Sequence, residues 1–153
     1  IESLSGSEYL EVIHNTIKGS PSIDLALETI VQDTCIKGIQ AGIIKSAHDC
    51  SDGGLAVALA ESCIAGNIGL VCDQGIKGRW DTALFGETQS RIVLSVSPDE
   101  IASFQELALS TGTPYVVLGI VGGERLIVNS LLNTNIAELS YVWQNAIAGH
   151  INS

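Results

Sequence analysis

Two polar segments contain the residue types that bind phosphate and metal ions. The first, SAHDCSDGGL at residues 46–55, is expected to join a strand to a helix. The first turn of a helix has unpaired N–H groups and partial positive charge. This makes Ser51, Asp52, Gly53 and Gly54 candidates for holding a phosphate. Asp49 is the candidate metal ligand, because Mg²⁺ is held by few carboxylates together with waters and phosphate oxygens.

The same segment also has a purely structural explanation. Asp52 would cap the helix, and Gly53 and Gly54 would form a tight turn. His48 and Asp49 would then make only local hydrogen bonds. The residues alone leave both explanations open.

The second polar segment is LFGETQSR at residues 84–91, which leads into a strand. Glu87, Thr88 and Gln89 can all form hydrogen bonds, and the ends of sheets often open into ligand-binding crevices. These three residues are therefore ligand candidates. The structural alternative is a polar turn in which Arg91 pairs with Glu87.

Helices and strands alternate around these segments. Ser20 as a cap and Pro21 at the first helical position predict a helix from there to Gly42. Further helices are expected over 55–65, closed by Gly66-Asn67, from Ser97-Pro98-Asp99-Glu100 onward, and from Asn135 and Glu138 to the end of the chain. The last of these carries an apolar stripe of Leu139, Val142, Trp143, Ala146 and Ile147.

Apolar runs predict strands over 43–48, 68–72 and 91–97, the last largely buried. Two more strands, 115–121 and 125–128, are expected to pair as a hairpin through Gly122-Gly123-Glu124. The predicted class is α/β or α+β, with helices layered on a mixed β-sheet.

Length and charge exclude several classes of function. The 153 residues fit one domain, and 7 Lys plus Arg against 17 Asp plus Glu give a net charge of −10. Nucleic acids and anionic membranes are therefore not expected as partners. No apolar run approaches the ~20 residues that span a bilayer, so a cytoplasmic location is expected. Because the chain lacks Met and begins with Ile1, we expect it to be a piece of a longer protein.

The four cysteines are Cys35, Cys50, Cys63 and Cys72. Their spacing contains no CxxC pair, so neither a zinc ribbon nor a thioredoxin-like motif is indicated. Cysteines in apolar surroundings behave as small hydrophobic residues. Buried free thiols are therefore expected.

Taken together, the motifs resemble a known family. HDCSDGGLAVALAE followed by LFGETQSR resembles the C-terminal domain of the PurM-like superfamily, and within it the last domain of the phosphoribosylformylglycinamidine synthase subunit II family. The GSEYL segment at 6–10 and VLGIVGGERL at 117–126 agree with this resemblance, which covers nearly the whole chain. The implied fold is that of the PurM C-terminal domain, with residues 1–19 leading in from a preceding domain and 20–153 forming the domain.

The resemblance implies a ligase of purine biosynthesis that uses ATP and Mg²⁺ to activate the formamide oxygen of formylglycinamide ribonucleotide. Ammonia from a glutaminase then forms the amidine. The implied partners are N-terminal PurM-like domains of the same polypeptide, a glutaminase subunit or domain and a small accessory subunit. The chain alone is expected to be inactive.

The resemblance also assigns roles to residues. Asp49 becomes the metal candidate, and Gly53, Gly54, Glu87, Thr88 and Gln89 become ligand candidates, in a catalytic or an auxiliary nucleotide site. Thr88 stands where the family commonly has Ser. No catalytic residue is assigned, because the family's catalytic His belongs to an N-terminal domain. We therefore expect no catalytic role for the three histidines His14, His48 and His150.

Two other kinds of function are compatible with these residues. The first is a related ATP-dependent enzyme that shares this domain, such as aminoimidazole ribonucleotide synthetase, selenophosphate synthetase, thiamine-monophosphate kinase or the hydrogenase maturation protein. The GSEYL and LFGETQSR segments argue against these enzymes. The second is a structural or interaction domain that binds no ligand.

Overall fold

The computed structural model describes residues 3–151, with side-chain placement up to residue 147. The chain divides into two compact units, one formed by 1–58 and 77–116 and the other by 59–76 and 117–153. The boundary between residues 58 and 59 lies within helix α3 (Gly54–Gly66). Each unit has a sheet of its own.

In the first unit, a two-stranded antiparallel sheet brings the two polar segments to the same end. The elements of this unit besides α3 are α1 (Glu8–His14), α2 (Leu25–Gln40), β1 (Ile44–Asp49), α4 (Trp80–Phe85), β3 (Ile92–Val96), the 3₁₀ turn η1 (Pro98–Glu100) and α5 (Ile101–Thr111). Asp49 at the end of β1 lies opposite Ile92 at the start of β3. The Cys50 N–H donates to the Arg91 carbonyl at 3.0 Å, which extends this pairing by one step.

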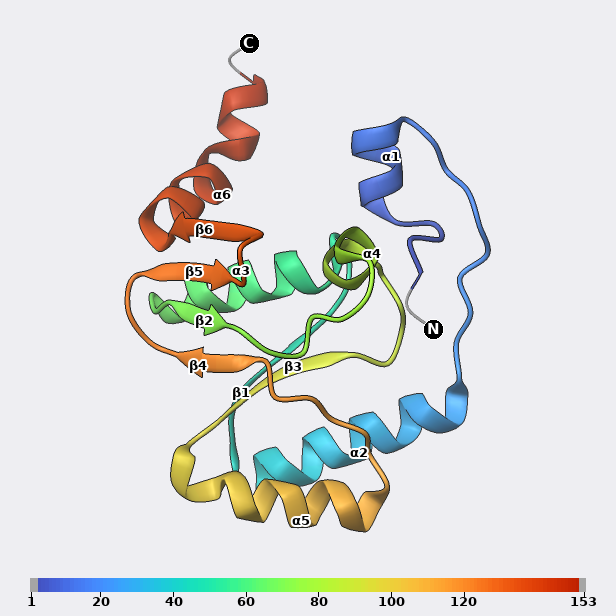
Figure 1. The fold of residues 1–153 in the computed structure, drawn as a ribbon, viewed down its shortest axis with the longest axis vertical. Coiled ribbons are helices and arrows are strands. Elements are labelled where there is room, and N and C mark those ends of the chain that lie inside the picture. Colours follow the sequence, from blue (N-terminus) through green and yellow to red (C-terminus); the bar gives the residue numbers. More distant parts are fainter. Residues whose placement is uncertain (1–2, 152–153) are drawn as a thin grey trace. The chain divides into compact units, whose positions relative to one another are not determined.

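Helix α2 packs against α5 and β1 (Figure 1). Gly38 permits this close approach, because a Cβ there would lie 2.5 Å from Cδ1 of Ile44. Further along the helix, Thr34 is only 2% exposed. Its hydroxyl oxygen lies 2.7 Å from that of Thr111 and 2.6 Å from that of Thr113. This hydroxyl cluster ties α2 to the end of α5.

The second unit contains a four-stranded sheet in the order β4-β2-β5-β6. Its elements besides α3 are β2 (Leu70–Cys72), β4 (Gly119–Val121), β5 (Arg125–Val128), β6 (Leu132–Asn135) and α6 (Ile136–Ile151). Cys72 and Val128, which face each other in the β2–β5 ladder, are completely buried. Ile120, which pairs with Val71, is 78% exposed. One face of this sheet therefore belongs to the core.

The predicted hairpin between 115–121 and 125–128 is wrong. Strand β2 lies between β4 and β5, pairing antiparallel with β4 and parallel with β5. The turn instead bonds to Gly69, whose carbonyl accepts from the Gly122 N–H at 2.7 Å and whose N–H donates to the Gly123 carbonyl at 2.8 Å. A glycine turn between two apolar runs does not reveal that a third strand has inserted between them.

The start of α2 also differs from the prediction. The helix begins after Asp24, whose carboxylate accepts from the Ala26 and Leu27 N–H groups at 3.0 Å each. Ser20 and Pro21 lie outside the helix. An Asp that accepts from two N–H groups of the first turn is a strong cap, and its carboxylate also complements the helix dipole.

Three short elements were missed, α1, α4 and β6. They have seven, six and four residues, too short for a clear periodic pattern. Strand β3 is half-buried along its length, less than predicted. Ser97 precedes the 3₁₀ turn η1 and makes no side-chain capping hydrogen bond, contrary to the prediction.

Other predictions are confirmed. Asn67 ends α3 in a left-handed conformation with φ 46°. The Asn135 side chain accepts from the Ala137 N–H at 2.8 Å at the start of α6. Cys35, Cys50, Cys63 and Cys72 are all buried and free.

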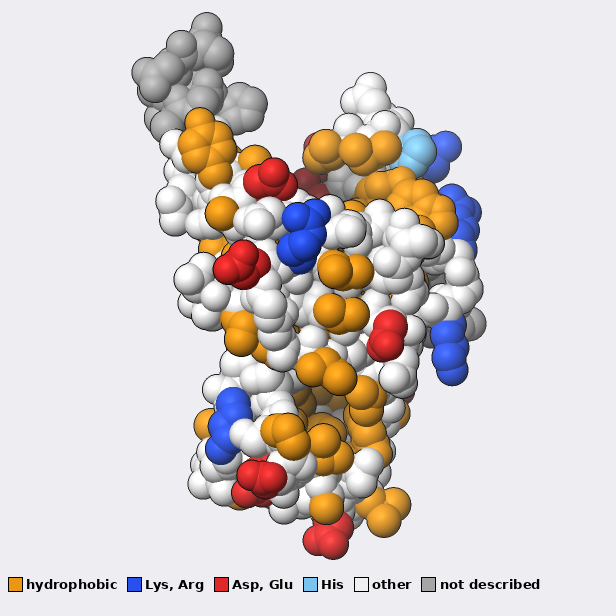
Figure 2. Space-filling model, turned by 60° about the vertical axis from the view of Figure 1, so that its left-hand side comes forward, with side chains coloured by type: hydrophobic (Ala, Val, Ile, Leu, Met, Phe, Trp, Pro, Cys, Tyr) orange, Lys and Arg blue, Asp and Glu red, His pale blue; other side chains and the backbone are white. Residues whose placement is uncertain are grey.

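Large apolar side chains nevertheless remain at the surface, and Figure 2 shows one face on which many of them (orange) are exposed. Over the whole described surface, the exposed large apolar side chains include Val12 and Ile13 on α1, Ile120 on β4, and Val142, Trp143 and Ile147 on α6. Much of the apolar stripe predicted for the last helix is therefore exposed. No helix among the described residues is long and apolar enough to cross a membrane.

Candidate functional site

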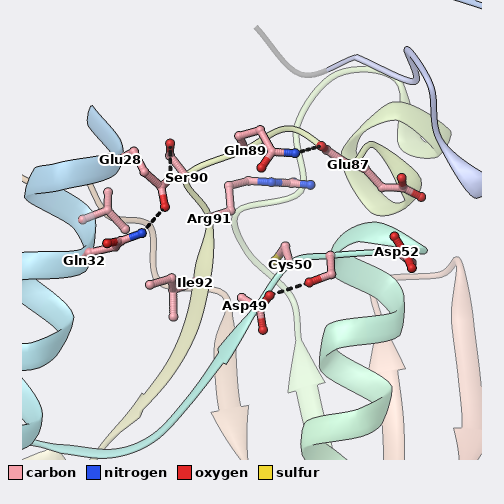
Figure 3. A pocket seen from close by; sticks show the side chains of 12 residues that line it. Glu28, Gln32, Asp49, Cys50, Asp52, Glu87, Gln89, Ser90, Arg91 and Ile92 are labelled. Carbon is pink, nitrogen blue, oxygen red and sulfur yellow. Dashed lines mark hydrogen bonds between the residues drawn. The ribbon is translucent and has the colours of Figure 1, made fainter. Parts of the chain in front are cut away.

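The two polar segments line one cavity of about 350 Å³ in the first unit. Its walls come from α2, the end of β1, the turn before α3 and the 87–92 segment (Figure 3). The lining residues are Glu28, Val31, Gln32, Asp49, Cys50, Ser51, Asp52, Glu87, Gln89, Ser90, Arg91 and Ile92.

Five of the eight predicted site residues line this cavity, and three do not. Those that do are Asp49, Ser51, Asp52, Glu87 and Gln89; Gly53, Gly54 and Thr88 lie outside its lining. The structure thus joins residues of two segments that are more than 30 positions apart. The binding role of each residue stays a prediction.

Asp49 has an exposed side chain that is held ionised. The Ser51 hydroxyl donates to Asp49 Oδ2, and this hydrogen bond lowers the pKa of the Asp49 carboxyl. An exposed, ionised carboxylate is a group that can coordinate Mg²⁺ together with waters. No group of three or more His, Cys, Asp or Glu able to hold a metal occurs among the described residues. Any Mg²⁺ here would take its other ligands from water and phosphate oxygens.

The two glycines at the start of α3, Gly53 just before the helix and Gly54 as its first residue, adopt left-handed conformations with φ 78° and 65°. The Gly53 N–H donates to Glu87 Oε1 at 2.9 Å, and the Gly54 N–H donates to the Ser51 carbonyl at 3.0 Å. A Cβ on Gly54 would lie 2.6 Å from the Gly86 carbonyl oxygen. The space that Gly54 leaves is therefore filled by backbone of the same chain.

Glu87 connects three of the motifs found in the sequence. Its Oε1 accepts from the Gly53 N–H at 2.9 Å and from the Glu8 N–H, in the GSEYL segment, at 2.8 Å. Next to it, the Thr88 hydroxyl accepts from the Ser3 N–H at 3.3 Å. Glu87 thus serves as an internal anion for two backbone donors, whatever else its carboxylate binds.

Arg91 bonds to backbone carbonyls of the second polar segment. Its guanidinium folds back over the preceding loop, donating from Nε to the Thr88 carbonyl at 3.2 Å and from Nη2 to the Gly86 carbonyl. Gln89 Nε2 donates to the Glu87 carbonyl at 3.4 Å. The loop is therefore held by its own polar side chains.

Sequence reasoning missed the contribution of α2 to this site. Glu28 and Gln32 on α2 lie more than 50 positions before the second polar segment, yet both line the cavity. Their spacing of four residues is an ordinary helix-surface pattern. No signal in the sequence would have placed them there.

The charge of the cavity wall limits what it can bind. Four carboxylates, those of Glu28, Asp49, Asp52 and Glu87, face one guanidinium, that of Arg91. An anion such as a phosphate would need a cation with it. Cys50 also lines the wall, and burial raises the pKa of its thiol, which disfavours a thiolate nucleophile.

Two of the three histidines, His14 and His48, lie among the residues whose side chains the structure describes. His14 lies on α1 with its ring centroid 5.4 Å from that of Tyr9. His48 Nδ1 lies 2.7 Å from the Asp49 carbonyl oxygen. His150 lies beyond the residues whose side chains the structure describes.

Comparison with known proteins agrees with the motifs. The family model described as AIR synthase related protein, C-terminal domain, matches residues 2–129. The chain belongs to this family. Within the match lie both polar segments and the whole cavity lining.

Curated relatives of this family member are phosphoribosylformylglycinamidine synthase subunits PurL. The subunit of Anaeromyxobacter sp. (strain K) is 41% identical over 94% of this chain and 20% of its own length. That of Synechocystis sp. is 39% identical over 99% of this chain and 21% of its own length. The chain thus spans about a fifth of the length of these relatives.

Solved structures share the fold. Phosphoribosylformylglycinamidine synthase II of Thermotoga maritima matches with a TM-score of 0.66 at 20% identity, over 78% of this chain and 22% of that one. The ATP complex of T. maritima PurL matches with the same TM-score at 18% identity, over 90% of this chain and 24% of that one. The α/β class and the PurM-like fold expected from the sequence are confirmed.

Proposed function

We propose that this chain is the C-terminal domain of an ATP-dependent ligase of purine biosynthesis. The enzyme would convert formylglycinamide ribonucleotide and glutamine-derived ammonia to formylglycinamidine ribonucleotide. The observation that carries the proposal is the convergence of the two family motifs on one cavity. The two curated relatives described above, both named as subunits of this synthase, support the same activity.

The chain's own share of the reaction is binding. Ser51 and Gln89 offer neutral polar groups to a phosphorylated ligand at the cavity wall, and Asp49 holds the Mg²⁺ that accompanies it. Mg²⁺ when bound offsets the charge of the phosphate oxygens against the acidic wall. Gly53, Gly54 and Thr88 act indirectly, by shaping the turn and the loop around the wall.

The catalytic machinery and the partners lie in other parts of the enzyme. We infer cytoplasmic N-terminal PurM-like domains of the same polypeptide, a glutaminase and a small accessory subunit. Exposed apolar side chains on α1, β4 and α6 provide surface for such neighbours, because large exposed apolar groups mark interaction sites. The 153-residue chain alone should hydrolyse no ATP.

A purely structural domain is the second candidate. The internal use of the Gly53 N–H and the Glu87 carboxylate favours it, because both groups already have partners within the chain. It predicts that the cavity residues affect stability and leave ligand affinity unchanged.

Ligand binding to the full-length protein decides between these candidates. Melting temperature is measured with and without Mg²⁺ together with ADP or formylglycinamide ribonucleotide, for the wild type and for Asp49→Asn. A binding domain predicts a smaller Mg²⁺-dependent shift in Asp49→Asn. The matched control is Asp33→Asn on α2, where an exposed carboxylate pairs with Lys37. Equal shifts in all three proteins would show that Asp49 binds no ligand.

A further inference from the structure

Glu28 makes contacts that helix formation does not require. Asp24 already caps α2, and the Glu28 N–H makes the ordinary first-turn bond to the Asp24 carbonyl at 2.9 Å. Its carboxylate instead binds two side chains. Oε2 accepts from the Ser90 hydroxyl at 2.6 Å, outside the helix, and Oε1 accepts from Gln32 Nε2 on the same helix. Figure 3 shows this group at the α2 wall of the cavity.

Ser90 is the residue that needs such a partner. Its φ of 64° lies in the left-handed region, which is unfavourable for any residue with a Cβ. Such a conformation persists only when surrounding contacts hold it in place. The hydrogen bond from its hydroxyl to a carboxylate is a contact of the stronger, charge-assisted kind.

The backbone conformation at Ser90 determines where the side chains of the two neighbouring residues lie. Gln89 and Arg91 both line the cavity, and Arg91 also bonds back to the Gly86 and Thr88 carbonyls. On the other side, the Arg91 carbonyl accepts from the Cys50 N–H at 3.0 Å, next to Asp49. A change of φ at Ser90 would therefore move both polar side chains of this wall and strain the tie to β1.

We propose that Glu28 is a positioning residue. Through the Ser90 hydroxyl it holds the left-handed backbone at Ser90, and so keeps Gln89 and Arg91 at the cavity wall. It acts as a hydrogen-bond acceptor and not as a ligand of a bound cation. The hydrogen bond between Ser90 and Glu28 does not depend on the proposed function. Only its effect on ligand affinity rests on that function.

Amide hydrogen exchange in the full-length protein tests the tie directly. Backbone amides of residues 86–92 should exchange about tenfold faster in Glu28→Ala and in Ser90→Ala, as the loss of a charge-assisted hydrogen bond implies. The double variant should exchange no faster than either single one, because both remove the same contact. Ser90→Gly should be milder than Ser90→Ala, since glycine accepts the left-handed φ without strain.

Two further variants separate positioning from cation binding. Glu28→Gln keeps an acceptor oxygen for Ser90 but loses the charge, so in exchange and in affinity it should lie closer to the wild type than Glu28→Ala does. Glu106→Ala, which removes an exposed carboxylate from α5, is the control. Affinity is measured with two probes, ADP and formylglycinamide ribonucleotide, each with Mg²⁺. Glu28→Ala and Ser90→Ala should weaken binding of the same probe by a similar factor.

The outcomes are distinct. Unchanged exchange at 86–92 in Glu28→Ala would overturn the proposal. So would a loss of affinity in Glu28→Gln equal to that in Glu28→Ala while Ser90→Ala binds normally, since that pattern indicates direct coordination. If the wild-type protein forms no amidine and binds neither probe, the proposed function fails, and the exchange measurement still decides the role of Glu28.

Discussion

Replacing Gly54 with Ala should destabilise the first unit more than its left-handed backbone alone explains. Gly54 has φ 65°, and a Cβ would lie 2.6 Å from the Gly86 carbonyl oxygen and 3.0 Å from that of Leu84. Both atoms are backbone at the end of α4, so a side-chain rotation cannot relieve the contact. Either the start of α3 or the end of α4 has to move.

Two energetic costs add up to the expected loss of unfolding free energy in Gly54→Ala. A residue with a Cβ in the left-handed region costs about 1–2 kcal/mol. Forcing atoms into a packed site adds about 1–3 kcal/mol. Gly54→Ala should therefore lower the free energy of unfolding by about 2–4 kcal/mol. Gly54→Val should cost more, because its branched Cβ is larger.

Gly112→Ala provides the matched control. Gly112 ends α5 with φ 74°, and a Cβ there would meet nothing within 4 Å. This variant pays the cost of the left-handed backbone, about 1–2 kcal/mol, without the steric term. The difference between the two variants isolates the contact with α4.

Urea unfolding followed by tryptophan fluorescence is the assay. Trp80 lies in α4 with its ring centroid 6.4 Å from that of Phe85, directly beside the predicted displacement. Trp143, the other tryptophan, is 57% exposed and is replaced by Phe in all variants so that Trp80 reports alone. If Gly54→Ala costs no more than Gly112→Ala, the close approach of the α4 backbone to Gly54 is refuted.

Three further predictions follow from other contacts. Glu87→Ala should lower the free energy of unfolding by about 2 kcal/mol, because two backbone N–H groups lose a charged acceptor. The control, Glu106→Ala, should have a free energy of unfolding within about 0.5 kcal/mol of the wild type. Arg79 bonds the buried Asp81 carboxylate and lowers its pKa below the usual value near 4. Arg79→Met should therefore have a lower free energy of unfolding than the wild type at pH 7. This difference in free energy should shrink as the pH falls through the folded-state pKa of Asp81, since protonation removes the ion pair. A difference that is independent of pH would contradict this prediction. Burial raises the pKa of all four thiols, so a thiol reagent at pH 8 should label the folded chain far more slowly than the urea-unfolded chain. Rapid labelling of the folded chain would contradict the burial of that cysteine.

Local patterns in the sequence were sufficient for much of the fold. The helix over 55–65 and the strand over 43–48 came within a residue or two of α3 and β1. Asn67 was correctly placed as a left-handed cap. Such features depend on contacts within a few residues, so periodicity and capping residues predict them. Helix α2 shows the limit, because Asp24 and Ser20 are both good caps and only the folded chain shows which is used.

Strand pairing depended on the tertiary structure. The glycine turn at 122–123 is compatible with a hairpin, but β2 lies between the two strands and its Gly69 takes the turn's hydrogen bonds. Choosing between these pairings requires comparing contacts between residues some 50 positions apart. No local propensity contains that information.

The candidate site shows the same division. The sequence by itself determined the chemistry of the two polar segments and the family to which they belong, because residue type and spacing are local properties. Only the tertiary structure showed that Glu87 bonds the N–H groups of Glu8 and Gly53, and that Glu28 reaches Ser90 from α2. These contacts join parts of the chain 34 to 79 residues apart. Their formation depends on how helices pack on the sheet, which is decided by the whole core.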